Sequence, residues 1–308
     1  MFDRIHHAGL AVADLAAAKQ VFADGLGLFE DPTPSMRRAL GGGDGRQRGT
    51  DPTEIIDVPI GNSEIELNAP PTDGSPVGGT HRFIEARGGV GALHHVCLHS
   101  TNVPDDIAHL RASGIEQIAA SPERLASDEP WQGVSFFHPR DCAGVLLEIW
   151  ATDNHRIGDG NQGLGIFTRL HHLGVVTDDL EKARHFWCNV IGLRVDTLRS
   201  PVRKGGRLVD SGRSHILNIP VGSDGGEIVA LAPQAADSST RQFLERYGGR
   251  AGGTMHHIAL ATADVKNAAE FVQGNGLKII GAANDEFAWV HPKSASGVLI
   301  QIVRDDLR

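Results

Sequence analysis

The stretch Ile5-His6-His7-Ala8-Gly9-Leu10-Ala11-Val12-Ala13-Asp14-Leu15 decides the fold, because it returns as Leu170-His171-His172-Leu173-Gly174-Val175-Val176-Thr177-Asp178-Asp179-Leu180. Each copy alternates like a strand and ends in an aspartate that can cap a following helix. A His-His pair also returns midway through each half, as His94-His95 and His256-His257. We therefore expect a duplicated scaffold in which a strand leads into a helix.

Periodicity predicts the same order of elements in both halves. In the first half we expect strands at 5–12, 54–58, 64–68, 93–99, 134–138 and 145–150, and helices at 14–25, 80–86 and 105–112. In the second half we expect strands at 170–176, 216–219, 227–231, 257–260, 287–291 and 298–303, and helices at 179–190, 240–247 and 265–273. These elements predict an α+β fold with four tandem βαβββ units.

The expected domains are an N-terminal module at 1–151, a linker at 152–165 and a C-terminal module at 166–308. The linker, TDNHRIGDGNQGLG, has no apolar period. A second stretch of turn residues, 32–52, predicts a long loop. Its four arginines could meet the phosphates of a CoA ester, although a solvated loop is the favoured interpretation; they are Arg37, Arg38, Arg46 and Arg48.

Composition excludes several classes of protein. A chain of 308 residues has room for two domains, and its net charge of −9 argues against a nucleic-acid-binding protein. No apolar run is long enough for a membrane span and no signal peptide is evident, so a cytoplasmic location is expected. The three cysteines lack Cys-x-x-Cys spacing, which argues against a disulfide framework or a thiolate zinc site.

The histidines instead indicate a metal site. Successive side chains of a strand face opposite sides, so only one histidine of each pair is expected to face the inside of a curved sheet. In the first half the candidates are one histidine from each pair, one acidic residue of Glu64 or Glu66, and Glu148. Glu148 lies in an apolar strand, where a carboxylate is costly to bury without a cation. Such a set suits a divalent first-row ion.

Both halves resemble the vicinal oxygen chelate (glyoxalase, bleomycin resistance and dioxygenase) superfamily, and most closely its methylmalonyl-CoA epimerases. The motifs are His7-x-Gly9-Leu10-Ala11-Val12, Gly61-Asn62-Ser63-Glu64-Ile65-Glu66-Leu67, Gly91-Ala92-Leu93-His94-His95, and His138-Pro139 followed by Gly144-Val145-Leu146-Leu147-Glu148. The resemblance implies two glyoxalase-like open-barrel modules. It also implies one divalent ion per chain (Zn, Co, Mn, Ni or Fe), with ligands His7, Glu66, His95 and Glu148. The implied acid/base groups are Glu148 and Glu54.

The second module departs from this pattern. His172 and His257 remain, but Val229 and Gln301 stand where the first module has its two carboxylates. Valine cannot bind a metal and glutamine is a weak neutral ligand. We expect this second site to be degenerate, without a metal or altered.

The expected function is therefore proton transfer next to a carbonyl, as in an epimerase or isomerase, and an acyl-CoA is one candidate substrate. A glyoxalase-type lyase and a ring-cleaving dioxygenase are the rival enzymes. The dioxygenases, however, keep their intact ligand set in the second module. A non-catalytic binding or resistance protein is the alternative of another class. The expected partner is a small-molecule substrate, without nucleic acid or membrane; the modules would form an internal pseudo-dimer, and the chain could also form a homodimer.

Overall fold

A computed structural model describes residues 2–29, 53–72, 78–120, 135–150, 163–200, 207–209, 213–223 and 226–306. The strands of the first half are β1 (Phe2–Ala11), β2 (Glu54–Ile60), β3 (Ser63–Ala69), β4 (Ala92–Ser100), β5 (Gln117–Ala120), β6 (Ser135–Phe137) and β7 (Leu146–Trp150). Those of the second half are β8 (Arg169–Thr177), β9 (Arg207–Val209), β10 (Ser214–Pro220), β11 (Glu227–Pro233), β12 (Gly253–Thr262), β13 (Phe287–Val290) and β14 (Leu299–Arg304). The predicted loop at 32–52 and most of the predicted linker lie outside the described residues.

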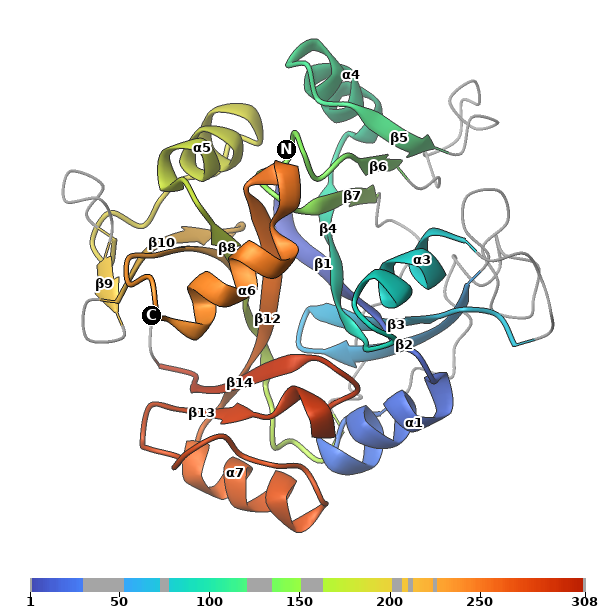
Figure 1. Ribbon diagram of the computed structural model, residues 1–308, viewed down its shortest axis with the longest axis vertical. Coiled ribbons are helices and arrows are strands. Elements are labelled where there is room, and N and C mark those ends of the chain that lie inside the picture. Colours follow the sequence, from blue (N-terminus) through green and yellow to red (C-terminus); the bar gives the residue numbers. More distant parts are fainter. Residues whose placement is uncertain are drawn as a thin grey trace. The chain divides into compact units, whose positions relative to one another are not determined.

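Each half builds its own seven-stranded mixed sheet (Figure 1). Sheet A has the order β2-β3-β1-β4-β7-β6-β5, and sheet B has the order β13-β14-β12-β8-β11-β10-β9. In both sheets the two strands that contain a His-His pair are neighbours in the middle of the strand order. The predicted α+β class and the two glyoxalase-like modules are confirmed.

The four βαβββ units are recognisable to different extents. Strands β4 to β7 with one helix, and β8 to β11 with another, each give three strands after the helix. In the last unit Ile279 forms an isolated bridge to Val290 and takes the place of a third strand. Strands β5 and β9 were absent from the sequence prediction, because both are short and neither alternates.

The equivalent helices begin alike in the two halves. Helices α1 (Leu15–Lys19) and α5 (Leu180–Arg184) each start at the predicted aspartate cap: Asp14 Oδ1 accepts a backbone N–H bond of 2.9 Å and Asp179 Oδ1 accepts one of 2.8 Å. Both helices continue as wider π-helical segments, η1 (Gln20–Gly25) and η3 (His185–Val190). The first segment ends at Gly25, the last residue of the helix expected at 14–25.

The remaining helices are α3 (Gly79–Ala86), α4 (Val103–Ala112), α6 (Ser239–Tyr247) and α7 (Val265–Gly274), with short turns η6 (Gly249–Ala251) and η7 (Pro292–Ser294). A polar side chain caps the first turn of α4, α6 and α7, whereas α3 follows Gly78 and has no side-chain cap. Helices α1 and α3 pack on β3, and α7 packs on β13 and β14 (Figure 1). Among the described residues no helix is long and apolar enough to cross a membrane.

Two compact units cut across the sheets. One contains Met1–His6, His95–Thr152 and His172–His256, and the other contains His7–His94, Asp153–His171 and His257–Arg308. Each unit therefore holds part of both sheets. The predicted domain boundaries remain a prediction.

The same glycine contact recurs inside both units. In the first unit a Cβ on Gly144, just before β7, would collide with the backbone of Gly253 at the start of β12. In the second unit a Cβ on Gly297, just before β14, would collide with the backbone of Gly91 just before β4. The glycines allow the backbones to approach, and their repetition follows the duplication of the sequence.

Candidate metal centre

The paired histidines of β4 and β12 alternate as a strand requires. The rings of His94 and His256 each contact a helix aromatic edge-on: Phe83 of α3 at 4.6 Å and Phe243 of α6 at 4.7 Å between centroids. Burial lowers the pKa of His256 to about 4, so this imidazole is neutral near pH 7.

The second histidine of each of these pairs contacts a strand aromatic instead. His95 packs edge-on against Phe136 of β6 at 5.5 Å between centroids, and His257 packs against Trp289 of β13 at 4.9 Å. The different partners show that the two histidines of each pair point in different directions. This matches the alternation expected from the sequence.

The predicted ligands meet in two pairs, one inside each compact unit. In the first unit His95 on β4 and Glu148 on β7 are both buried, and Glu148 Oε2 lies 3.1 Å from Nε2 of His95. An imidazole nitrogen and a carboxylate oxygen are ligands that suit a divalent first-row ion.

The second pair, inside the other unit, is buried Glu66 on β3 with buried His7 on β1. Oε2 of Glu66 lies 4.0 Å from Nε2 of His7, and Oε1 of Glu66 accepts a 2.8 Å hydrogen bond from the side-chain amide of Asn68. That amide orients the carboxylate from behind, as partners of metal ligands commonly do.

The register explains why two carboxylates occupy equivalent places. Glu66 is paired with Gly9 across the parallel strands β3 and β1, and Glu148 is paired with Cys97 across β7 and β4. Each carboxylate therefore lies opposite the residue two positions after a candidate histidine ligand. The local sequence is repeated, so the two halves of the sheet present equivalent ligands.

The burial of charge favours a bound cation. The buried carboxylates of sheet A are Asp57, Glu64, Glu66 and Glu148, each no more than 2% exposed. Among the residues that the structure describes, no lysine or arginine side chain is buried to a comparable extent. Burying several carboxylates is costly without cations or donors. The donor set and its burial therefore fit a divalent ion.

Glu54, the other predicted acid/base group, is placed away from these ligands. It is paired with Ala69 across β2 and β3, whereas Asp57 is paired with Glu66. Paired residues share a face, and positions three apart on a strand do not. The Glu54 carboxylate instead accepts two 3.0 Å hydrogen bonds from the backbone and hydroxyl of Thr72.

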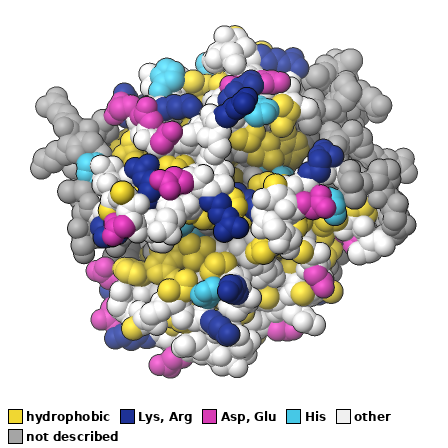
Figure 2. Space-filling view, in the orientation of Figure 1, with side chains coloured by type: hydrophobic (Ala, Val, Ile, Leu, Met, Phe, Trp, Pro, Cys, Tyr) yellow, Lys and Arg dark blue, Asp and Glu magenta, His cyan; other side chains and the backbone are white. Residues whose placement is uncertain are grey.

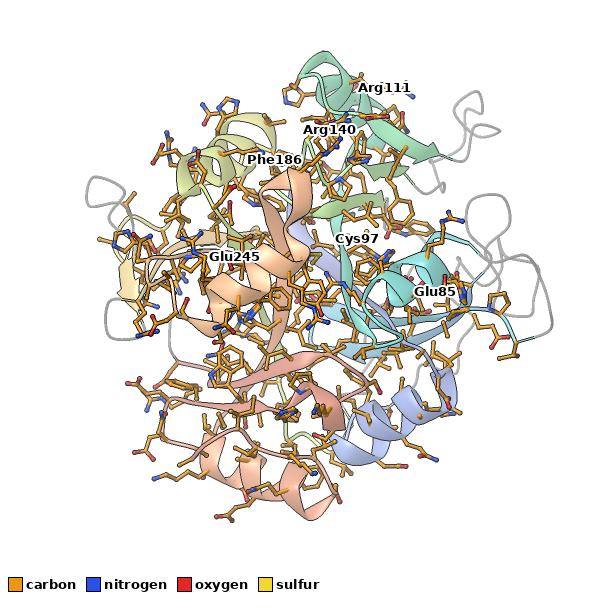
Figure 3. The ribbon with its side chains drawn as sticks, viewed as in Figure 1. Glu85, Cys97, Arg111, Arg140, Phe186 and Glu245 are labelled. Carbon is orange, nitrogen blue, oxygen red and sulfur yellow. The ribbon has the colours of Figure 1, made fainter. Side chains whose placement is uncertain are left out.

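Sequence reasoning missed Asp57, His6 and Cys97. A signal for Asp57 did exist: Pro59 is paired with Glu64 across the turn, so Asp57, two residues earlier, is paired with Glu66 and shares its face. No local signal identifies the other two, because the thiol of Cys97 and the imidazole of His6 meet only through neighbouring strands. Within one compact unit, candidate ligand atoms of His6 and of Cys97, which lies on β4 (Figure 3), are within 4.8 Å of each other.

Sheet B lacks the corresponding carboxylates. Val229 is paired with Gly174, and Gln301 with Ala259, in the positions of Glu66 and Glu148. His172 and His257 are buried, but among the described residues the candidate metal-binding groups lie in sheet A.

An arginine neutralises the buried carboxylate of sheet B. Arg199 donates to Glu227, which is buried and paired with His172, and also to Asp196 at 2.6 Å. Asn218 donates a 3.0 Å hydrogen bond to Glu227. Burial alone would lower the pKa of Arg199, but the two carboxylates outweigh it and raise the pKa above its usual value.

The face shown in Figure 2 carries acidic and basic side chains next to one another among its described residues.

Comparison with known proteins links the chain to one superfamily. Residues 6–131 and 171–288 match the sequence profile of the Glyoxalase/Bleomycin resistance protein/Dioxygenase superfamily. The mitochondrial methylmalonyl-CoA epimerase of Mus musculus is 28% identical over 147 residues, which cover 47% of this chain and 71% of that relative.

Two solved structures are similar over 99% of this chain. A triple mutant of 4-hydroxymandelate synthase from Streptomyces coelicolor has a TM-score of 0.69 at 13% identity, with 93% of that chain covered. The Mn(II)-bound glyoxalase from Novosphingobium aromaticivorans has a TM-score of 0.58 at 15% identity, with 82% of that chain covered. At these identities the likeness shows the fold alone.

Proposed function

Because this chain belongs to the Glyoxalase/Bleomycin resistance protein/Dioxygenase superfamily, we propose that its N-terminal module (1–151) is a divalent-metal-dependent epimerase or isomerase. The reaction would move a proton on a carbon next to a carbonyl. Acyl-CoA esters are the first substrates to test, since 47% of this chain aligns with a methylmalonyl-CoA epimerase. The C-terminal module (166–308), after a linker at 152–165, would bind no metal.

Two buried histidine–carboxylate pairs support this proposal: His95 with Glu148, and His7 with Glu66. These four residues would hold one ion per chain, and the nitrogen and oxygen ligands suit Zn, Co, Mn, Ni or Fe. When bound, the ion would stabilise negative charge that develops on a substrate oxygen, and so acidify the adjacent carbon.

Glu148 is one proposed acid/base group, because its buried carboxylate lies among the candidate ligands. Two residues compete for the role of a second group. Resemblance to the epimerases favours Glu54, whereas register favours Asp57, which shares a face with Glu66. Epimerisation needs a proton removed from one side of the carbon and returned to the other, so two groups are required.

Elemental analysis of the purified protein is the first test, followed by a screen of acyl-CoA esters and 2-oxo acids for proton exchange in deuterated water. One metal ion per chain with exchange into a substrate would support the proposal. A protein that binds no divalent metal, or binds it without exchange in any substrate, would contradict it.

Matched variants identify the second acid/base group. Asp57→Asn and Glu54→Gln each remove one negative charge with little change of volume. If Asp57 moves the proton, its variant loses at least about 100-fold in exchange while Glu54→Gln stays near wild type. The opposite result would restore Glu54. Metal content measured on both variants separates loss of the acid/base group from loss of the ion.

The rival functions give different readouts. A ring-cleaving dioxygenase would consume oxygen with a catechol or 2-oxo acid, and a glyoxalase-type lyase would break or form a bond of its substrate without consuming oxygen. A binding or resistance protein would retain its ligand without turnover and without stoichiometric metal. The proposed ligand set would lie in the first module, opposite to the arrangement implied for the dioxygenases, and this favours the isomerase.

A further inference from the structure

We propose that sheet B has a cation position of its own, which the guanidinium of Arg199 occupies in place of a metal ion. The position is formed by the carboxylates of Asp196 and Glu227, and all three residues belong to the same compact unit. In this arrangement Arg199 keeps divalent ions out of the C-terminal module. The comparison with a metal in sheet A rests on the proposed function, whereas the cation position itself does not.

Two carboxylates enclose the guanidinium at a place that water reaches only in part. Nε of Arg199 donates a 2.6 Å hydrogen bond to Asp196, and Nη2 donates a second hydrogen bond to Glu227. The side-chain exposures are 16% for Arg199, 24% for Asp196 and 10% for Glu227. A small cation from solvent therefore has a route to the position once the arginine side chain is removed.

Both carboxylates have further partners that hold them independently of the guanidinium. Nδ2 of Asn218 donates a 3.0 Å hydrogen bond to Oε2 of Glu227. The backbone N–H groups of Leu198 and Arg199 donate to Oδ1 of Asp196 at 3.0 and 3.1 Å. Shortening the side chain of Arg199 leaves these bonds in place, so the carboxylates are expected to keep their orientation. Ligands of metal ions commonly have such outer partners.

The register relates this position to the ligand side of sheet A. Glu227 on β11 is paired with His172 on β8, and Glu64 on β3 is paired with His7 on β1. His172 and His7 stand at the same place in the repeated motif, so the two buried glutamates are equivalent. In sheet B a side chain of the protein supplies the positive charge for this glutamate, whereas in sheet A the proposed ion would supply positive charge.

The neighbouring equivalent positions differ in charge in the same sense. In sheet A Asp57 is paired with Glu66, whereas in sheet B Asn218 is paired with Val229. Sheet B thus carries two fewer acidic side chains at these positions. A divalent ion suits the more acidic set and a single guanidinium suits the less acidic one, because buried charges are costly unless they are compensated.

Two cations serve as probes of the position. Carboxylate oxygens alone suit hard ions such as Ca²⁺, whereas the proposed imidazole and carboxylate ligands of sheet A suit first-row ions. Ca²⁺ therefore distinguishes the position in sheet B from the proposed metal centre. Guanidinium is the second probe, since it has the charge and the planar shape of the group that Arg199→Ala removes.

Thermal unfolding of the metal-free protein tests the position. Arg199→Ala should gain at least ~2 °C in Tm from about 10 mM Ca²⁺ or guanidinium, relative to NaCl of equal ionic strength. Wild type should not show this gain, and Arg199→Ala combined with Glu227→Gln should lose it. Arg184→Ala is the matched control, because it removes a guanidinium from an exposed ion pair with Glu181. Absence of a gain with both probes, or an equal gain in wild type or in the double variant, would overturn the proposal.

Two further measurements keep the test decisive. After dialysis against Ca²⁺, Arg199→Ala should retain one more Ca²⁺ per chain than wild type, and equal contents would contradict a calcium-binding position. If Arg199→Ala unfolds without a cation, its refolding yield with and without each probe gives the same comparison, and no increase with either would overturn the proposal. The Mn²⁺ content of wild type tests the proposed function separately. A wild-type protein without bound Mn²⁺ contradicts the proposed metal centre, while the comparison in Ca²⁺ still decides the cation position.

Discussion

Replacement of Glu148 by glutamine should change the stability of the protein in opposite directions with and without metal. The side chain is fully buried, and its carboxylate lies 3.1 Å from the imidazole of His95. Without a metal, the protein bears the desolvation cost of this buried carboxylate. Glu148→Gln removes the charge with little change of volume.

The expected magnitudes follow from burial and binding. In the apoprotein the variant should be as stable as wild type, or up to ~2 kcal/mol more stable, because the desolvation cost of an ion disappears. At a metal concentration of 100 times Kd, wild type gains ~2.7 kcal/mol from binding. For a module of this size that gain raises Tm by roughly 5–10 °C. The variant should lose most of it.

Thermal unfolding at pH 8, in a chelator and then in excess Mn²⁺, measures both effects. Gln301→Ala is the matched control, since Gln301 is the counterpart of Glu148 in sheet B and should leave the metal-induced shift unchanged. An equal shift in Glu148→Gln and wild type would refute the ligand assignment. A variant several kcal/mol less stable than wild type in the chelator would refute the reasoning about buried charge.

Three further predictions concern charge, pH and close packing. Arg199→Met should destabilise the fold by ~3–5 kcal/mol in chemical unfolding, because it leaves buried Glu227 without its cation. The double variant Arg199→Met with Glu227→Leu should recover most of that loss, and failure to recover it would contradict the pairing. Burial lowers the pKa of His256 to about 4, so the neutral imidazole contributes fully to the free energy of unfolding above about pH 6.5, and this contribution is lost as the pH falls toward 4. His256→Gln should reduce this acid-induced loss of unfolding free energy by up to ~3 kcal/mol. An unchanged pH dependence would exclude His256 as its source. Gly144→Ala should lower the free energy of unfolding by at least ~2 kcal/mol more than Gly114→Ala does. Both glycines have positive φ, but only a Cβ on residue 144 would collide with backbone atoms. Equal decreases in the free energy of unfolding would refute the contact.

The repeat made much of the fold predictable. Asp14 and Asp179 were recognised as helix caps from a few neighbouring residues, because capping is a local interaction. Most strands were found from alternation alone. The short strands β5 and β9 escaped because they are held by neighbouring strands and carry no pattern of their own.

The candidate site was predictable in part for the same reason. His7, Glu66, His95 and Glu148 stand in repeated motifs, so the sequence could propose them as a set. Their role as ligands stays a prediction, as do one ion per chain, the cytoplasmic location and the oligomeric state.

The sequence by itself determined the duplication, the element order and the residue types available for chemistry, because periodicity and capping depend on nearby residues. Only the tertiary structure placed Asp57 beside Glu66 and turned Glu54 away, brought His6 to Cys97, and supplied Arg199 to Glu227. The physical reason is that each of these encounters depends on the register between strands, or on the path of a loop, far apart along the chain. A single residue of slip would turn a side chain to the other face of its sheet.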